Sequence, residues 1–156
     1  MDAQDAVVTF LMADDDPDDR MLTAKALREH HAISGMAFVE DGEELMDYLC
    51  RRGQYVNPAS SPRPGVILLD LNMPRKDGRQ ALREIKTDPH LRTIPVIILT
   101  TSKAEEDILR SYDLGVNAYI TKPVTFQALV DVTRVLAQFW CEIVMLPNFS
   151  NGVSNV

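Results

Sequence analysis

The feature that most constrains the fold is a run of apolar residues that stops at an aspartate. Residues 66–69 are all apolar, two of them are β-branched, and Asp70 follows directly. A continuous apolar run of this length is typical of a strand that is buried on both faces, as in a parallel sheet. Pro74 and Gly78 then require the chain to turn. Ligands of open α/β sheets gather at the carboxyl ends of the strands, so we expect Asp70 to lie at the mouth of a site.

Further apolar runs of strand length alternate with segments of helical spacing. The expected strands cover residues 7–13, 36–39, 66–70, 95–101 and 118–121. The expected helices begin near Pro17, Asp41, Gly78, Ser102 and Thr125. In the first helix, Met21, Ala24 and Leu27 recur at near-helical spacing, and residues 53–65 are expected to form a long surface loop. Five strands alternating with five helices predict an α/β protein whose parallel sheet carries helices on both faces.

Size and charge limit the classes of function. The 156 residues suffice for one domain, and we expect it to cover residues 6–147, followed by a polar tail at 148–156. A net charge of −7 argues against a nucleic acid partner, which requires clustered Lys and Arg. The sequence shows no signal peptide and no apolar run that could span a membrane. Cys50 and Cys141 have no metal or redox spacing, so we expect a reduced, cytoplasmic protein.

Polar residues stand at four of the predicted strand ends. Asp14 and Asp15 follow the first strand, Asp70 ends the third, Thr100 ends the fourth and Lys122 follows the fifth. Each residue alone is more often structural, as a helix cap, a strand-end hydroxyl or a surface cation. Their coincidence favours a site, because three carboxylates repel one another and suit a hard divalent cation such as Mg²⁺. A carboxylate beside such a cation can act as a nucleophile on phosphorus, while an ammonium and a hydroxyl contact the phosphoryl oxygens.

Four stretches carry these residues in a characteristic order: ADDDPDD, LLDLNMPRKDG, PVIILTTS and AYITKP. Over about residues 6–137 the chain thereby resembles the receiver domain of bacterial two-component response regulators. The resemblance implies a flavodoxin-like, doubly wound sheet of five parallel strands in the order 2-1-3-4-5 with five helices.

The resemblance also implies the reaction and the roles of the site residues. Such a domain accepts a phosphoryl group from a sensor histidine kinase and switches the surface of its fourth helix, fifth strand and fifth helix. It is not otherwise an enzyme, since it catalyses only its own phosphotransfer and autodephosphorylation. The implied phosphoacceptor is Asp70; the implied Mg²⁺ ligands are Asp15, Asp70, the Asn72 backbone carbonyl and, through water, Asp14; the implied phosphoryl contacts and switch residues are Thr100, Lys122 and Tyr119.

A narrower resemblance concerns the second half of the chain. The stretch TTSKAEEDILRSYDLGVNAYITKPV, the segment FWCEIVMLP and the Pro-rich residues 53–65 are similar to stand-alone regulators that are paired with phytochrome-type histidine kinases. This resemblance implies a phytochrome-type kinase as partner and no output domain fused behind the receiver.

Two other classes of function are compatible with parts of the pattern. A haloacid-dehalogenase-like phosphatase also uses a strand-end Asp, but its acidic pair follows the Lys, and a second Asp stands two residues after the nucleophile, where this chain has Asn72. A pseudo-receiver would be an interaction scaffold that is never phosphorylated. Such a scaffold is expected to lack part of the quintet of strand-end residues, and this chain retains all of it.

The C-terminal segment continues apolar beyond the length that the fifth helix needs. The excess apolar residues include Phe139, Trp140, Ile143, Val144 and Leu146. A segment that is hydrophobic nearly all round must be buried against something, and an exposed patch of this kind marks an association site. We therefore expect a homodimer that uses the fifth helix and residues 139–146. The alternative is an arm that folds back onto its own domain.

Overall fold

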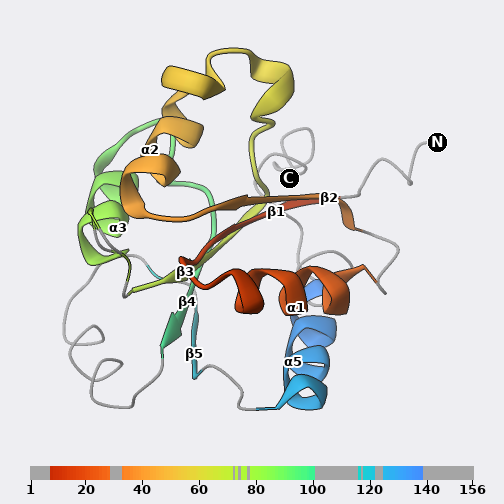
Figure 1. The fold of residues 1–156 in the computed structure, drawn as a ribbon. Helices are drawn as coiled ribbons and strands as arrows, with labels where there is room; N and C mark the ends of the chain where they lie inside the picture. The colour runs from red at the N-terminus through yellow and green to blue at the C-terminus, as the bar shows by residue number, and fades with distance from the viewer. Residues whose placement is uncertain are drawn as a thin grey trace, which may run out of the picture.

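The computed structural model describes residues 8–28, 33–71, 73, 75–76, 78–100, 116, 118–121 and 125–138. Within these residues a five-stranded parallel sheet has the order β2-β1-β3-β4-β5 (Figure 1). The strands are β1 (Val8–Ala13), β2 (Ile33–Val39), β3 (Val66–Asp70), β4 (Val96–Thr100) and β5 (Ala118–Thr121). The α-helices are α1 (Pro17–Leu27), α2 (Gly42–Cys50), α3 (Gly78–Thr87) and α5 (Phe126–Gln138). The predicted fold class and strand order are confirmed, whereas the helix expected to begin near Ser102 lies outside the described residues.

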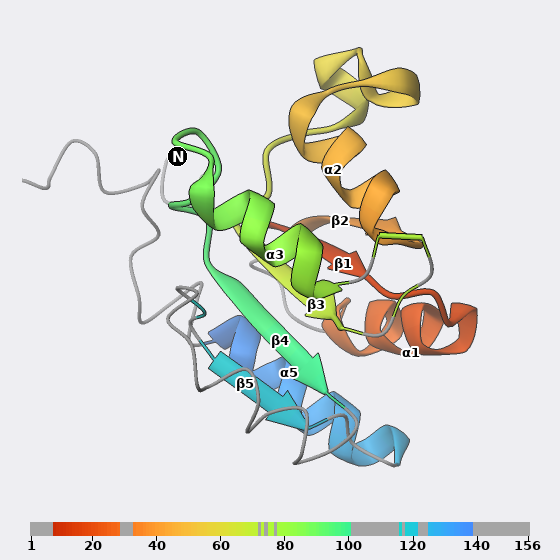
Figure 2. The ribbon, with the colours of Figure 1, turned by 90° about the vertical axis from the view of Figure 1, so that its left-hand side faces the viewer.

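The helices form two layers, one on each face of the sheet. Figures 1 and 2 show α1 and α5 together on one face and α2 and α3 on the other. Every residue of β3 is buried, as predicted for a strand covered on both faces. Ile67 and Leu69 share a core with Leu45 of α2, while Leu68 packs in a second core with Leu27 of α1. The central strand that carries Asp70 is therefore fixed from both sides. No helix of the described residues is long and apolar enough to cross a membrane.

Aspartates begin the two helices that flank the carboxyl edge of β1 and β2. The Asp16 carboxylate accepts a hydrogen bond of 2.9 Å from Asp18 N at the start of α1, where Pro17 is the first helical residue. The Asp41 carboxylate accepts one of 2.8 Å from Glu44 N at the start of α2. Such caps satisfy backbone N–H groups that have no partner within the helix. The predicted start of the first helix near Pro17 is confirmed.

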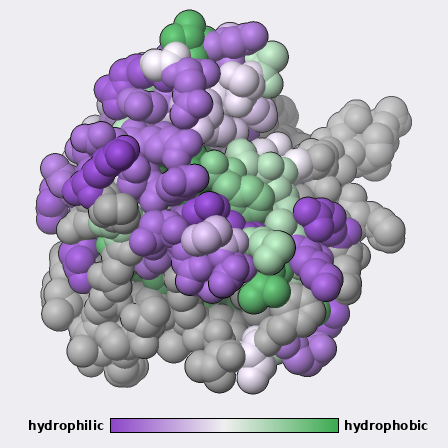
Figure 3. Space-filling view, viewed as in Figure 1, coloured by the Kyte–Doolittle hydropathy of each residue, from purple (hydrophilic) through white to green (hydrophobic). Residues whose placement is uncertain are grey.

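The three apolar residues that recur at near-helical spacing in α1 do not all lie on its buried face. Met21 is 61% exposed, whereas Ala24 and Leu27 are buried. The other buried residues of α1 are Thr23 and Ala26. At 100° per residue, Met21 lies roughly 140° from the centre of this buried arc, so it faces solvent. Figure 3 shows hydrophobic surface over α1 and over the region of β1 and β2, with hydrophilic surface around it.

Strand β2 is longer than the apolar pattern indicates. It begins at Ile33, three residues before the predicted start, and pairs with β1 from Val8 to Ala13. Backbone pairing with β1 extends β2 through Gly35, which is opposite Thr9 and where the sequence has no apolar signal.

The Pro-rich segment at residues 53–65 has more structure than a loop. It contains two 3₁₀ turns, Gly53–Tyr55 and Pro58–Ser60. The Tyr48 hydroxyl of α2 donates a hydrogen bond of 2.9 Å to Pro62 O, and burial raises the pKa of Tyr48 above its ordinary value, so this donor stays protonated. Composition predicts a loop here, but contacts with α2 order it.

Candidate functional site

The strand ends align at one edge of the sheet. In the parallel ladders Ala13 is opposite Leu69, Asp70 is opposite Leu99, and Thr100 is opposite Thr121. Because these neighbours run in the same direction, the residues that end or follow them lie side by side. The sheet therefore brings Asp14, Asp70 and the backbone of Thr100 to the same edge, as the sequence predicted.

Three carboxylates converge at this edge. One carboxylate oxygen each from Asp14, Asp15 and Asp70 lies within 4.8 Å of the others. Asp14 is fully buried and Asp70 is 4% exposed, whereas Asp15 is exposed. Negative charges this close repel one another, and the repulsion is strongest where water is excluded. The donor set fits a hard divalent cation, since Mg²⁺ is bound through a few carboxylates together with water and phosphate oxygens.

The turn after β1 fixes the first two of these aspartates. Asp14 N donates to Val39 O at 3.0 Å, which extends the pairing of β1 with β2 by one residue. The Asp14 carboxylate accepts from Asp16 N at 2.9 Å, and Asp14 O accepts from the Arg20 guanidinium at 2.8 Å. With Asp14 held inward and Asp16 capping α1, Asp15 is left facing solvent at the edge. The sequence did not indicate Arg20, because a contact between a helix side chain and a carbonyl six residues earlier has no periodic signal.

The turn after β3 returns to the backbone of Asp70. Gly78 N donates to Leu71 O at 3.0 Å. A Cβ atom at Gly78 would lie 2.5 Å from Asp70 O and 2.6 Å from Leu71 Cα, so only glycine fits. The sequence marked Gly78 as a turn residue. The structure shows that its role is close contact with the backbone at Asp70.

A second contact attaches this turn to the start of α2. Gly42 N donates to Lys76 O at 2.9 Å, and a Cβ atom at Gly42 would lie 2.0 Å from that oxygen. Beside it, the Arg75 guanidinium is 3.2 Å from the Asp41 carboxylate. Arg75 has a φ of 63°, in the left-handed region. The sequence predicts a helix that begins near Asp41, but the contact with residues more than 30 positions away has no local signal.

The remaining predicted site residues are described in part. Thr100 ends β4, and its side chain is not described. Tyr119 of β5 is half-buried and packs against the core on the α2 and α3 side of the sheet. The predicted residues that lie outside the described part of the chain are Asn72, Lys122, Phe139, Trp140, Ile143, Val144 and Leu146.

The chain is similar to known proteins over nearly its whole length. Residues 10–134 match the family model of the response regulator receiver domain. The chain is 41% identical over 138 residues to response regulator Rcp1 of Synechocystis sp., a match that covers 88% of this chain and 92% of Rcp1.

Solved structures agree with this match. The crystal structure of the phosphorylated cyanobacterial phytochrome response regulator RcpA is 42% identical with a TM-score of 0.82, and the match covers 90% of this chain and 99% of RcpA. The Mn²⁺-bound form of Rcp1 is 40% identical with a TM-score of 0.79, over 90% of this chain and 99% of that one. With the five-stranded sheet and the acidic edge, these matches establish that the chain belongs to the family of response regulator receiver domains.

Proposed function

We propose that the chain accepts a phosphoryl group from a sensor histidine kinase onto Asp70 in a Mg²⁺-dependent reaction. The observation that carries this proposal is the convergence of Asp14, Asp15 and Asp70 at the carboxyl edge of the central strand. Family membership supports it, because the similar protein RcpA is known in a phosphorylated form. A phytochrome-type kinase is the proposed partner. The solved structures that support it are those of the response regulators RcpA and Rcp1, and RcpA is called a phytochrome response regulator.

The Asp70 carboxylate is the nucleophile of the proposed reaction. One of its oxygens attacks the phosphorus of the kinase phosphohistidine, forming a P–O bond as the P–N bond breaks. The electron pair stays on the imidazole nitrogen, which is then free to take up a proton. Hydrolysis reverses the state: water attacks the phosphorus, the bond to Asp70 breaks, and inorganic phosphate leaves. These two steps are the only chemistry that we assign to the chain.

The cation ligands follow from the acidic edge. Asp15 and Asp70 would hold Mg²⁺ directly, together with the backbone carbonyl of Asn72, and Asp14 would act through water. When bound, the cation supplies positive charge that screens the phosphoryl oxygens during transfer. Thr100 and Lys122, which stand at or directly after the neighbouring strand ends, are the proposed phosphoryl contacts. The similar protein Rcp1 is known in a Mn²⁺-bound form, which supports divalent-cation binding by this chain.

Phosphotransfer tests the function as a whole. A purified phytochrome-type kinase that carries phosphohistidine should label the chain with Mg²⁺ present, and it should do so faster than unrelated histidine kinases. Faster labelling by unrelated kinases would contradict the pairing with a phytochrome-type kinase but would leave phosphoryl acceptance in place. No labelling by any kinase or by acetyl phosphate would contradict phosphoryl acceptance and favour the scaffold alternative.

The exposed aspartate of the trio offers the cleanest test of cation binding. Asp15→Asn should weaken Mg²⁺ binding by about tenfold or more, because a charged ligand is lost from a site of few ligands. Since Asp15 is exposed, the change leaves the core intact. Isothermal titration calorimetry measures the affinity. The matched control is Asp18→Asn, which removes the same charge from an exposed position in the first turn of α1. Equal weakening in both variants would assign the effect to net charge and contradict a ligand role for Asp15.

We propose that Tyr119 reports the switched state. Its side chain is half-buried against the core beside α2 and α3. Tyr119 lies on β5, which pairs directly with β4, the strand that ends at Thr100. Phosphorylation draws the Thr100 hydroxyl towards the phosphoryl group, and Tyr119 should then become more buried and change the surface around β5. Crystal structures with and without a beryllofluoride phosphate mimic measure this. Unchanged positions of Thr100 and Tyr119 would contradict the mechanism.

We propose further that residues 6–147 form one receiver domain that dimerises through α5 and residues 139–146. Met21 of α1 and Val135 of α5 are exposed by 61% and 63%, and their two helices pack together on one face of the sheet. This layer therefore already offers apolar surface to a second copy. A chain truncated before Phe139 should be monomeric by light scattering while Asp70 remains phosphorylatable. A full-length chain that stays monomeric at high concentration, phosphorylated or not, would rule the dimer out.

A further inference from the structure

A cavity of about 260 Å³ lies at the end of the sheet opposite Asp70. It is bounded by the C-terminal end of α2, the residues that lead into β3, and the turn between α3 and β4. Pro64 lines it, and Asp70 lies six positions further along the chain, a distance of roughly 20 Å along an extended strand. The cavity is therefore separate from the carboxylate edge.

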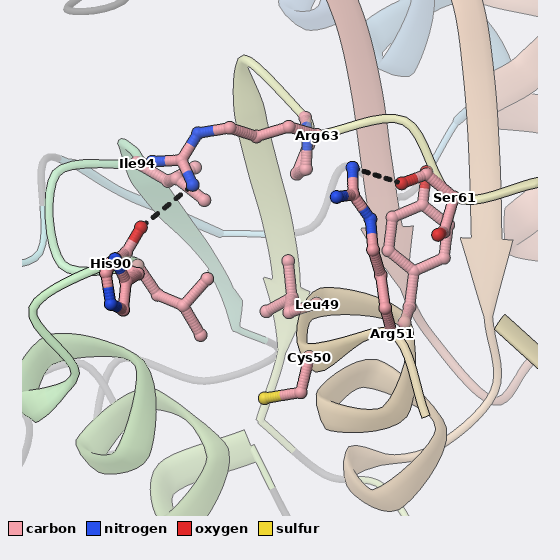
Figure 4. Close-up of a pocket in the computed structure, with 10 residues that line it drawn as sticks. Leu49, Cys50, Arg51, Ser61, Arg63, His90 and Ile94 are labelled. Atoms are coloured by element: carbon pink, nitrogen blue, oxygen red, sulfur yellow. Dashed lines mark hydrogen bonds between the residues drawn. The ribbon is translucent and has the colours of Figure 1, made fainter. Parts of the chain in front are cut away.

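The lining is positively charged although the protein is acidic. Arg51, Arg63 and His90 line the cavity, and none of its ten lining residues is Asp or Glu. The chain as a whole has a net charge of −7. Figure 4 shows Arg51 and Ser61 on one side of the hollow, with His90 and Ile94 across from them. A hollow lined by one sign of charge concentrates ligands of the opposite sign, so this one favours anions.

The guanidinium groups retain donors for a ligand. Arg51 Nη2 is 3.4 Å from Ser61 O, a long hydrogen bond, and the described residues provide no acceptor for Arg51 Nε and Nη1. Arg63 donates to His90 O at 2.8 Å and to Thr93 Oγ1 at 3.3 Å, which holds it in place across the turn between α3 and β4. A guanidinium carries five N–H donors in a planar fork that matches phosphate oxygens.

The walls of the cavity are fixed before any ligand arrives. Ser61 Oγ donates to Tyr55 O at 3.2 Å, and Tyr48 holds Pro62. On the opposite wall, the Lys86 ammonium donates to Arg92 O at 3.0 Å and to Ile94 O at 2.9 Å, and burial lowers the pKa of Lys86. Preformed walls reduce the entropy that a ligand loses by ordering the protein.

The backbone at Arg51 is unusual for its residue type. Arg51 is the C-cap of α2 and has a φ of 56°, in the left-handed region. Glycine is the residue that most often ends a helix in this conformation, because it has no Cβ to crowd the backbone. The chain places an arginine there instead, and its side chain lines the cavity.

We propose that this cavity binds a small phosphate monoester, with its phosphate oxygens on Arg51 and Arg63. The cavity volume exceeds what a phosphate group alone fills, and the apolar side chains of Leu91 and Ile94 provide contact for a short organic group. The site lies outside the phosphorylation edge and requires no Mg²⁺. The chain would thereby carry an input for a soluble metabolite in addition to its phosphorylation site.

An NMR titration of the full chain with phenyl phosphate tests this proposal. The solution contains EDTA, so that the carboxylate edge repels the anion instead of binding it through a cation. We expect saturable shifts of the backbone amides of Arg51, Ser61 and His90, weaker binding of inorganic phosphate, and none of phenol. The absence of saturable shifts at these amides, or equal binding of phenol, would overturn the proposal.

A matched pair of variants tests the role of the guanidinium. Arg51→Gln should weaken phenyl phosphate binding by about tenfold or more, because a charge-assisted hydrogen bond is lost. The control is Arg52→Gln, which removes the same charge from the next residue, whose guanidinium pairs with Asp47 at 3.2 Å and does not line the cavity. This control should stay within about twofold of the wild-type affinity. Equal losses in the two variants would attribute binding to net charge and overturn the site.

Discussion

The Asp70→Asn variant should not be phosphorylated: labelling by acetyl phosphate with Mg²⁺ should fall to background. Asparagine has nearly the same shape as aspartate, but its amide is a poor nucleophile and a weak cation ligand. Asp70 is 4% exposed at the end of a strand whose residues are all buried, so a substitution of similar volume preserves the packing. The variant also removes one of three repelling carboxylates, so its free energy of unfolding without cation should not fall. Radiolabelling and urea denaturation measure the two quantities.

The control for this variant is Asp131→Asn on α5. Asp131 is exposed and pairs with Arg134 at 3.3 Å, and it lies outside the acidic edge. Its substitution should leave labelling at the wild-type level. Undiminished labelling of Asp70→Asn, with the phosphoryl group mapped to another residue, would contradict the assignment of the phosphoacceptor.

The largest loss of stability should come from Gly42→Ala. The new methyl carbon would lie 2.0 Å from Lys76 O, which is backbone and cannot rotate away. The start of α2 and the turn after β3 must therefore move apart. This movement breaks the hydrogen bond of 2.9 Å from Gly42 N to Lys76 O. We expect the free energy of unfolding to fall by at least about 2 kcal/mol, the range for overpacking combined with a broken buried hydrogen bond. Urea denaturation monitored by circular dichroism measures it.

Gly35→Ala provides the matched control for this substitution. At Gly35 the added Cβ would have its nearest neighbour, Thr9 Oγ1, at 3.7 Å, an ordinary contact. The free energy of unfolding should therefore stay within about 0.5 kcal/mol of the wild type or rise slightly. A Gly42→Ala protein as stable as Gly35→Ala would show that the contact between α2 and the turn after β3 does not constrain the chain.

The sequence predicted those parts of the fold that depend on local pattern. The apolar run before Asp70 identified a strand buried on both faces, and all five of its residues are buried. Because parallel strands end at the same edge, the positions of Asp14 and Asp15 in the sequence were enough to predict that they would meet Asp70. The recurrence of Met21 with two buried residues did not reveal which side of α1 faces the sheet, since spacing alone leaves the phase of a helix open.

Contacts between distant segments could not be predicted in this way. Gly78 was recognisable as a turn residue and Asp41 as the start of a helix. The close approach of Gly42 to Lys76 and of Gly78 to Asp70, however, depends on how these turns pack in space. The ordered Pro-rich segment is a similar case, because the hydrogen bond from Tyr48 to Pro62 is set by the position of α2. The candidate site thus has a core of residues that the sequence predicts and a supporting frame that only the structure shows.

In the proposed reaction, the acidic edge directs a phosphoryl group to Asp70 with the help of a divalent cation. Mass spectrometry of the intact wild-type chain after incubation with acetyl phosphate, in parallel samples with Mg²⁺ and with EDTA, measures this directly. We expect the mass gain of one phosphoryl group with Mg²⁺ and none with EDTA, and peptide mapping should place the group on Asp70. An equal mass gain in EDTA, or a phosphoryl group mapped to any other residue, would show that the acidic edge and its cation do not direct phosphorylation to Asp70.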